Sequence, residues 1–407
     1  MPEFGTSDDV VLLIAAFAAV VVLVAGIRER RRHRANIARL PLRISINGSR
    51  GKSTVTRLLT GALAAAGYRP FGKTTGTEAR LILGWSGEEL DIHRRPEGPN
   101  IGEQRDVMAQ AVREGADVMV SECMAVNPEY QGTFHRELLD ANVLVITNAL
   151  DDHLDEMGPT QEDVADVFAS TFPKNGIVAV TPSNHLARFE AAADEHESKL
   201  LVANPDEIDE LELAEFAHLV LPQHVALTLA ITRHLGIEDN VALRGMIDAP
   251  ADPFATRLLP IGDPSDPALF VNAFPANDPV STIGVFDHVR TLGYPETGMT
   301  VIMNCRDDRI SRTQLFATDV LPHLPIHTLI VTGSATRPVL RAVRDGQIAV
   351  TRVHDLTGAS ATDVVKALGD TPRHNVVMGV GNLHGGGVEI VAELEQLAPS
   401  HLVRGVA

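Results

Sequence analysis

The sequence predicts an α/β protein with two successive α/β domains behind a single N-terminal transmembrane helix. Three observations carry this prediction. Short aliphatic stretches alternate with helical ones along most of the 407 residues, which is typical of parallel sheets covered by helices. Five prolines between Asp248 and Pro267 interrupt this alternation, because regular helices and strands exclude proline from their interiors. An uncharged apolar run, Val10 to Ile27, precedes the first expected strand.

The apolar run is long enough to cross a membrane. It has eighteen residues, and a spanning helix needs roughly 17–25. The next seven residues, 28–34, hold five arginines and one glutamate, and positive residues stay on the cytoplasmic side. A cleaved signal peptide fits poorly because the leading segment is acidic, and a buried core helix would leave the arginines without a role. We therefore expect a single-pass protein of the cell membrane with cytoplasmic domains, in which residues 1–34 form the anchor and its basic juxtamembrane segment.

Composition narrows the class of protein. The formal net charge of −18 disfavours a nucleic-acid-binding surface. The two cysteines, Cys123 and Cys305, lie far apart without CxxC spacing. We therefore expect neither a disulfide framework nor a zinc site.

A glycine-rich stretch, NGSRGKST at 47–54, lies between an expected strand at 42–46 and an expected helix at 54–66. The usual phosphate loop reads G-x-x-x-x-G-K-[ST], whereas here the first glycine stands two positions later. The strand before, the helix after and the intact GKST favour nucleotide binding over a plain glycine turn. The expected nucleotide-binding residues of this loop are Gly48, Ser49, Arg50, Gly51, Lys52, Ser53 and Thr54.

Two further strand ends carry acidic residues. Glu122 follows the expected strand 118–121, and the stretch TNALDDHLD at 147–155 follows the strand 143–146. Because the carboxyl ends of parallel strands meet at one edge of a sheet, Glu122 and His153 are placed to hold Mg²⁺ beside the loop. A solvated carboxylate and an aspartate-rich helix cap are the simpler interpretations, and both stay open.

The proline-rich interruption predicts a domain boundary near residue 250. The central domain then covers 35–250 and the second covers 251–407, both of typical domain size. Beyond the boundary, strand-like runs resume at 269–272, 300–304, 328–332, 348–353 and 375–380. We expect a Rossmann-like α/β domain there. Its GVGNLHGGG stretch, 379–387, is weak evidence for a dinucleotide site, and we interpret it as a strand-to-helix turn.

The order of these motifs resembles that of the Mur ligase superfamily. GSRGKST is followed by TTGT at 74–77, SEC at 121–123 and TNALDDHLD at 147–155, and the superfamily uses the shorter G-x-x-G-K-[ST] loop. The resemblance implies a Mur-ligase-like P-loop ATPase domain ahead of the Rossmann-like domain. It also implies that ATP and Mg²⁺ drive amide-bond formation through an acyl-phosphate, with release of ADP and phosphate.

The resemblance also implies roles for single residues. The implied catalytic residues are Lys52, Glu122, His153 and Arg257, the implied metal ligands are Ser53, Thr77, Glu122 and His153, and further implied nucleotide contacts are Asn148, Arg257 and Asn272. Two departures from the family pattern leave a second metal and one adenine contact open. The stretch 164–168 lacks the metal-bridging lysine of most members, and the family's H-N-x-x-N reads HVALT at 224–228.

A closer resemblance is to the ligase subunit of poly-γ-glutamate synthase, the CapB/PgsB type. It rests on the N-terminal helix with its arginines and on NGSRGKST, FGKTTGT, RRPEGPNIGEQ, SECMAVNPEYQ, TNALDDHLDEMG, VNAFPANDP and GVGNLHGGG, which cover nearly the whole chain. Peptidoglycan ligases carry a UDP-sugar domain ahead of the loop, and barely twenty residues separate the apolar run from Gly48. Folylpolyglutamate synthases share the acceptor chemistry without a membrane helix.

This closer resemblance implies substrates and partners. They are glutamate, a poly-γ-glutamate acceptor and small integral-membrane synthase subunits of the CapC/PgsC and CapA/PgsA types, and a homo-oligomer is compatible. Because the acceptor is a polyanion, local cations should guide it, although a solvated basic surface is the simpler interpretation of each one. The substrate-binding candidates are Lys73, Arg94 and Arg95, with Arg80, Arg306 and Arg309 as further ones. Alternative functions are an ATPase of a polymer-export complex, another Mur-like polyglutamate ligase, and a nucleotide sensor without turnover.

Overall fold

The structure of the chain is a computed structural model. It describes residues 7–75, 79–92, 100–216, 218–252, 255–256, 258–262, 268–276, 278–291, 294, 298–369 and 375–397. The chain divides into two compact units: the first is Met1–Asp209 with Leu221–Pro250, and the second is Glu210–Val220 with Ala251–Ala407. From sequence alone, the segment 210–220 counts with residues 35–250. In the structure it packs with the second unit, where the N–H of Leu219 donates to the carbonyl oxygen of Thr256 (2.8 Å).

An eight-stranded sheet, counted over the described residues, forms the centre of the first unit in the order β4-β3-β2-β5-β1-β6-β7-β8. The strands from β2 to β8 in this order pair in parallel. At the other edge, β3 pairs antiparallel with both β2 and β4. The elements of this unit are α1 (Ser7–Ala38), β1 (Leu42–Asn47), α2 (Lys52–Ala65), β2 (Pro70–Lys73), β3 (Arg80–Leu83), β4 (Glu88–Asp91), α3 (Glu103–Arg113), β5 (Val118–Glu122), α4 (Pro128–Thr133), η1 (Phe134–Leu138), β6 (Val143–Ile146), α5 (Leu154–Met157), α6 (Gln161–Ala169), β7 (Ile177–Val180), α7 (Leu186–Glu195), β8 (Lys199–Val202), η2 (Pro205–Glu207), α9 (Pro222–His234) and α10 (Asp239–Ile247).

Helices cover both faces of this sheet because its parallel strands are aliphatic on both sides. Ile44 and Ile46 of β1 face α2 and α9 in one buried cluster. Leu144 and Ile146 of β6 face α6 and α7 in another. The sheet is therefore held between two helical layers, and the carboxyl ends of β1, β5 and β6 meet at one edge of it.

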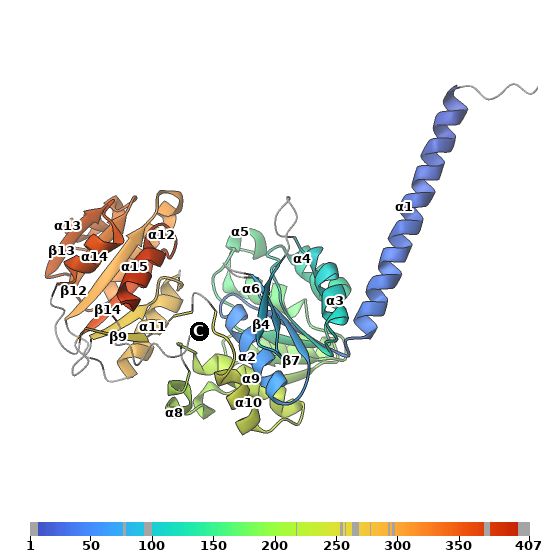
Figure 1. The fold of residues 1–407 in the computed structure, drawn as a ribbon, viewed down its shortest axis with the longest axis horizontal. Helices are drawn as coiled ribbons and strands as arrows, with labels where there is room; N and C mark the ends of the chain where they lie inside the picture. Colours follow the sequence, from blue (N-terminus) through green and yellow to red (C-terminus); the bar gives the residue numbers. More distant parts are fainter. Residues whose placement is uncertain are drawn as a thin grey trace, which may run out of the picture. The chain divides into compact units, whose positions relative to one another are not determined.

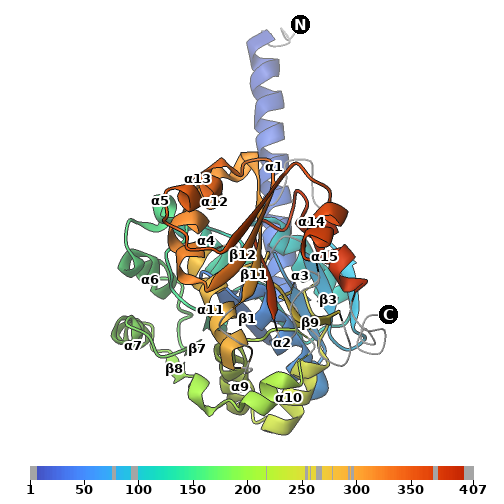
Figure 2. The ribbon, with the colours of Figure 1, turned by 90° about the vertical axis from the view of Figure 1, so that its left-hand side faces the viewer.

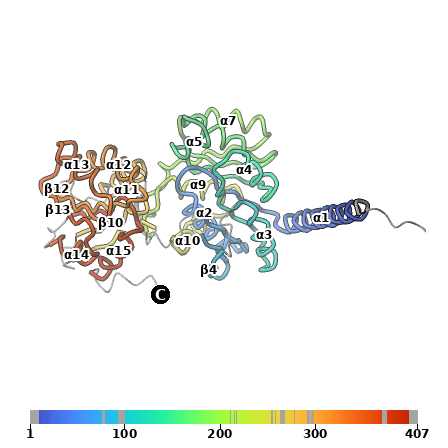
Figure 3. Tube along the Cα trace, turned by 90° about the horizontal axis from the view of Figure 1, so that it is seen from above, coloured from blue at the N-terminus to red at the C-terminus, as the bar shows by residue number. Residues whose placement is uncertain are grey.

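The N-terminal helix α1 continues unbroken from the apolar run through the arginines. Its segment from Val10 is long and apolar enough to cross a membrane, and none of its most apolar stretch is buried. The helix leaves the first unit beside α3 (Figures 1 and 3). Its last turns are fixed there by the ion pair of Glu29 with Arg105 (3.0 Å) and by a contact of His33 Nε2 with the carbonyl oxygen of Glu137 (3.3 Å).

A six-stranded sheet forms the second unit, again counted over the described residues, in the order β13-β12-β11-β14-β10-β9. Its strands are parallel except β9, which is antiparallel at one edge. The elements are α8 (Glu210–Ala214), β9 (Leu258–Ile261), β10 (Ala268–Asn272), α11 (Pro279–Thr291), β11 (Met299–Cys305), η3 (Asp307–Arg309), α12 (Ile310–Asp319), η4 (Leu321–His323), β12 (Ile326–Gly333), α13 (Arg337–Arg344), β13 (Arg352–Thr357), α14 (Ala361–Ala367), β14 (Val376–Gly381) and α15 (Gly387–Glu395).

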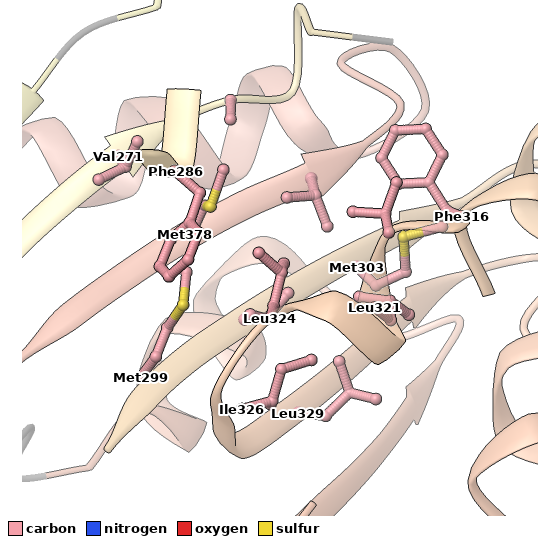
Figure 4. Packing of buried hydrophobic residues seen from close by; sticks show 14 of the residues in the cluster. Val271, Phe286, Met299, Met303, Phe316, Leu321, Leu324, Ile326, Leu329 and Met378 are labelled. Carbon is pink, nitrogen blue, oxygen red and sulfur yellow. The ribbon is translucent and has the colours of Figure 1, made fainter. Parts of the chain in front are cut away.

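Two buried clusters fill the two faces of this second sheet. Helices α11, α12 and α13 cover one face, and α14 and α15 cover the other (Figure 2). On the first face Met303 and Met378 of adjacent strands pack with Phe316 of α12 and Phe286 of α11 (Figure 4). This arrangement confirms the prediction of a second α/β fold that follows the phosphate-loop fold in the sequence.

Candidate active site

The phosphate loop follows β1 and ends where α2 begins at Lys52. Gly48 has a φ of 122°, and a Cβ on it would overlap the hydroxyl of Thr147 and lie 2.9 Å from the carbonyl oxygen of Asn148. Only glycine therefore fits at this point. Gly51 lies directly against the ring of His224. The shorter G-x-x-G-K-S motif of the loop thus corresponds to a tight turn packed between β6 and α9.

Asn148 holds this loop in place through both ends of its side-chain amide. Its Oδ1 accepts from the N–H of Arg50 (2.9 Å), and its Nδ2 donates to the carbonyl oxygen of Arg50 (3.1 Å). The hydroxyl of Ser49 donates to the carbonyl oxygen of Leu150 (3.0 Å). In this structure Asn148 therefore positions the loop backbone.

Lys52 lies over the loop that it follows. Its Nζ donates to the carbonyl oxygens of Gly48 (2.6 Å) and Ser49 (3.1 Å). Helix α2 has neither a side-chain cap nor an acidic residue in its first turn. The positive end of the helix dipole and the Lys52 ammonium therefore both lie at the phosphate loop, and together they favour the binding of an anion there.

Glu122 joins three segments at the carboxyl end of β5. This carboxylate is buried, and its Oε2 accepts from the hydroxyl of Ser53 (2.8 Å) and from the N–H of Thr75 (2.8 Å). The strand order that places β5 beside β1 and β2 brings these groups together. A carboxylate and a hydroxyl are oxygen ligands of the kind that Mg²⁺ prefers.

His153 lies at the end of the β6 loop, in the left-handed region with a φ of 48°. Its side chain is 53% exposed, and its Nε2 is 3.8 Å from Asp152 Oδ1. Asp152 in turn pairs with Arg50 of the phosphate loop (3.3 Å). His153 thus lies close to the loop through Asp152. Within the described ranges, no three His, Cys, Asp or Glu side chains gather closely enough to hold a metal ion by themselves.

Several predicted residues lie elsewhere or outside the described residues. Asn272 ends β10 in the second unit and is buried there. Arg80 pairs with Asp91, and Arg306 pairs with Asp308 (2.6 Å). The predicted residues outside the described part of the chain are Thr77, Arg94, Arg95 and Arg257.

Lys73 differs from the exposed substrate-binding cation that its charge suggests. It is fully buried at the end of β2, where its Nζ lies 2.9 Å from Glu103 Oε1 and donates to Gln104 Oε1 (3.2 Å). Burial lowers the pKa of Lys73, and the Glu103 carboxylate offsets part of that effect. Ser121 also donates to Gln104 Oε1 (3.1 Å). Lys73 therefore ties β2 and β5 to the start of α3 and presents no charge to an acceptor chain.

A buried amide network beneath the loop was not predicted from the sequence. Asn47 Nδ2 donates to Gln131 Oε1 (2.9 Å) and to His135 Nε2 (3.2 Å), and its Oδ1 accepts from the N–H of Gly48 (2.9 Å). Gln131 Nε2 also contacts Met157 Sδ (3.5 Å) at the end of α5. The network therefore links the loop to the segment that carries His153. The polar residues of NPEYQGTFH, 127–135, were the only sequence signal for it.

His135 is a buried histidine in this network. Burial lowers its pKa to about 3, so the imidazole is neutral and accepts from Asn47. It lies in η1, a π-helical turn, and such turns are frequent at functional sites.

The buried thiol of Cys123 beside Glu122 has a pKa raised to about 12 by burial and is therefore protonated.

Comparison with known proteins gives the family. The family model of the Mur ligase middle domain matches residues 46–234, and that of the poly-gamma-glutamate synthase CapB C-terminal domain matches residues 258–397. The chain is 46% identical over 392 residues to PGA synthase CapB of Bacillus subtilis (strain 168), which covers 96% of this chain and 99% of that protein. It is 43% identical over 374 residues to the capsule biosynthesis protein CapB of Bacillus anthracis, over 92% of this chain and 81% of that protein.

A solved structure supports the fold. The bifunctional folylpolyglutamate synthase/dihydrofolate synthase of Yersinia pestis, complexed with AMPPNP and a Mn ion, matches with a TM-score of 0.64 at 15% identity, over 90% of this chain and 93% of that chain. Fold and site together define an ATP-dependent amide ligase of the Mur ligase type. Within that class, the chain belongs to the poly-γ-glutamate synthase CapB family.

Proposed function

We propose that this chain adds glutamate to the carboxylate end of a growing poly-γ-glutamate chain and converts ATP to ADP and phosphate. The observation that supports this most directly is the buried Glu122 carboxylate, hydrogen-bonded to Ser53 at the start of α2. It adds a metal-binding oxygen to a loop that already favours an anion.

The residues at this edge of the sheet fit a nucleotide with a divalent metal ion. Mg²⁺ keeps several waters and takes one or two carboxylates together with phosphate oxygens. Ser53 Oγ and Glu122 Oε2, which lie 2.8 Å apart, are the two protein oxygens that we assign to it. When bound, the ion supplies positive charge to the phosphate oxygens. His153 and Thr77 complete the proposed ligand set.

Phosphoryl transfer is the first proposed step. An oxygen of the acceptor's terminal carboxylate attacks the γ-phosphorus of ATP, the bond to the β,γ-bridging oxygen breaks, and ADP leaves. The Lys52 ammonium and the N–H groups at the start of α2 stabilise the charge on the transferring oxygens. Arg257, from the FATR stretch, is proposed to add a second cation. Asn272 is proposed to contact the nucleotide.

Amide formation is the second step. The nitrogen of the incoming glutamate attacks the acyl carbon of the acyl-phosphate, phosphate leaves with the electrons of the C–O bond, and the nitrogen loses a proton. Because both reactants are held by one protein, the encounter is effectively unimolecular, which contributes several kcal/mol. Arg94 and Arg95 are the proposed cations for the anionic acceptor.

Membrane placement and partners complete the proposal. Helix α1 is proposed to span the membrane once, with both units in the cytoplasm, because the arginines follow the apolar run directly. The B. subtilis relative is called a PGA synthase. We accordingly infer that this chain works in a synthase complex with small integral-membrane subunits of the CapC/PgsC and CapA/PgsA types.

The reaction stoichiometry tests this function. Membranes that contain the chain and its partner subunits receive ATP and labelled glutamate, and the products are separated by mass spectrometry. One ADP and one phosphate should form for each new amide bond. AMP with pyrophosphate would contradict an acyl-phosphate route. ADP release without new amide bonds would instead support the export ATPase.

A further inference from the structure

A basic cavity lies where α1 joins the first unit. It has a volume of about 1090 Å³, and none of its lining residues belongs to the phosphate loop. Five arginines and three carboxylates line it, although the whole chain has a formal net charge of −18. The cavity is therefore a local positive site in an acidic protein, where an anion gains most.

The arginines of the cavity fall into two groups. Arg43 donates to the carbonyl oxygens of Asp140 (2.6 Å) and Leu40 (2.8 Å), and Arg105 pairs with Glu29. Arg136 donates to the carbonyl oxygen of Ser170 (3.1 Å), so these three arginines already serve the fold. Arg30 and Arg34 are exposed, and they make no hydrogen bond or ion pair within the described part of the chain.

Arg30 and Arg34 also differ from their neighbours in the same run. They are four positions apart and therefore lie on one face of α1, the face that lines the cavity. Arg31 and Arg32 stand between them in the sequence and are absent from the lining. The cavity therefore selects two specific guanidinium groups from a continuous basic run.

The depth of the cavity relative to a bilayer identifies its ligand. If α1 spans the membrane from Val10 to Ile27, as proposed above, the cavity begins at Gly26, at the edge of the hydrocarbon layer. With a rise of 1.5 Å per residue, Arg30 lies about 5 Å and Arg34 about 10 Å beyond Ile27, which is the depth of lipid headgroups. Guanidinium groups pair with phosphate oxygens through two parallel hydrogen bonds.

We propose that this cavity binds the headgroup of an anionic phospholipid, with Arg30 and Arg34 as the phosphate-binding residues. The inference rests on the proposed membrane placement of α1. Because Glu29 and His33 already hold the end of α1 against the first unit, a headgroup bound at this joint fixes the angle between the helix and the catalytic unit. The ligase site is thereby oriented relative to the membrane.

A matched pair of double variants tests the proposal. Arg30→Gln with Arg34→Gln removes the two cavity guanidinium groups, whereas Arg31→Gln with Arg32→Gln removes the same charge from the same run outside the cavity. The full chain, purified in detergent, is titrated with a water-soluble short-chain phosphatidylglycerol. The phosphatidylcholine of the same chain length and a γ-glutamyl oligomer serve as the other probes. Far-UV circular dichroism verifies the fold of each variant.

The native chain should bind phosphatidylglycerol, and the cavity pair should weaken that binding about tenfold or more, because each basic residue near a membrane surface contributes substantially. The outer pair should stay within about twofold, and Arg30→Lys with Arg34→Lys should recover part of the affinity. Equal weakening by both pairs would show a diffuse basic surface and overturn the site. Equal binding of phosphatidylcholine, or preferential binding of the γ-glutamyl oligomer, would overturn it as well.

Two separate measurements isolate the assumptions beneath this test. Flotation of the full chain with vesicles reports whether α1 enters a membrane, and glutamate-dependent ADP release reports the ligase activity. Neither depends on the short-chain lipid. Failure of lipid binding in a chain that floats and turns over would therefore count against the cavity alone.

Discussion

Two glycine-rich turns, one in each unit, connect a parallel strand to a helix. The first follows β1 and opens α2, and the second follows β14 and opens α15. Both helices begin after a glycine without a side-chain cap. The surroundings differ, since the first turn has Lys52 and the buried Glu122 carboxylate beside it, whereas α15 already carries Glu389 in its first turn.

Two side-chain amides close the second turn: Asn382 of the turn itself and Asn304 of the neighbouring strand β11. Asn304 Nδ2 donates to the carbonyl oxygens of Asn382 (2.6 Å) and His384 (3.2 Å), and Asn382 Nδ2 donates back to the carbonyl oxygen of Asn304 (3.1 Å). Arg312 donates to Asn382 Oδ1 (2.9 Å). Glycine spacing alone therefore marks a tight strand-to-helix turn. The charged groups that other strands bring to it decide whether it suits a phosphate.

Removal of the loop cation should have the largest effect. Lys52→Ala should lower glutamate-dependent ADP release by at least about 1000-fold, because the developing phosphoryl charge loses its fixed cation. The control Lys366→Ala, an exposed lysine of α14 in the second unit, should stay within about twofold. Comparable losses in both variants would place the effect outside the first turn. The measurement is ADP release at saturating glutamate.

Alanine at matching glycines should separate the two turns. Gly48→Ala should weaken ATP binding at least about tenfold, because its Cβ would overlap Thr147 and displace the loop. Gly381→Ala (φ 100°, with a Cβ 2.6 Å from the carbonyl oxygen of Asn304) should lower the melting temperature and leave ATP affinity within about threefold. Titration calorimetry and differential scanning calorimetry measure both quantities. The comparison fails if Gly381→Ala weakens ATP binding and Gly48→Ala does not.

Loss of the amide network beneath the first turn should have an intermediate effect. Gln131→Leu removes one of the two acceptors of the Asn47 amide, so that only His135 Nε2 remains, and it also removes the contact with Met157. Its cost should be about 1–3 kcal/mol of unfolding free energy, with roughly a tenfold rise in the KM for ATP. Gln314→Leu, at an exposed position of α12, is the matched control and should change neither. A normal KM in Gln131→Leu would mean that the loop does not need this support.

The smallest effect should be a change in pH dependence. Burial lowers the pKa of His135 from 6.5 to about 3, so the ring is neutral in the folded chain and gains a proton on unfolding below pH 6.5. Stability should therefore fall as the pH drops from 6.5 toward 3, and this residue contributes up to about 1.4 kcal/mol per pH unit. His135→Gln should make that slope shallower in urea unfolding between pH 5 and 7. An unchanged slope would contradict the buried neutral imidazole.

The parts of the site that lie at strand ends were predictable from the sequence. Parallel strands bring their carboxyl ends to one edge of the sheet, so Glu122 and the TNALDDHLD stretch could be assigned to the edge that holds the phosphate loop. The observed contact of Glu122 with Ser53 agrees with that assignment. Order along the chain was sufficient here because each motif directly follows its own strand.

The buried polar contacts could not be predicted in the same way. Lys73 suggests an exposed cation, because lysine is rarely buried without a partner, and its partner Glu103 lies thirty residues further along the chain. The contacts of Asn47 with Gln131 and His135 cross more than eighty residues. Such pairs depend on which helices lie beneath the loop, and composition and periodicity do not specify this.

The magnesium dependence of ATP binding tests the central assignment most directly. Calorimetric titrations of ATP at graded Mg²⁺ concentrations are compared for the native chain, Glu122→Gln and the matched control Glu389→Gln. The account predicts that Glu122→Gln raises the Mg²⁺ concentration for half-maximal ATP binding about 10- to 100-fold, while Glu389→Gln leaves it unchanged. Native magnesium dependence in Glu122→Gln would contradict the account, because the buried carboxylate beside Ser53 would then not be a metal ligand.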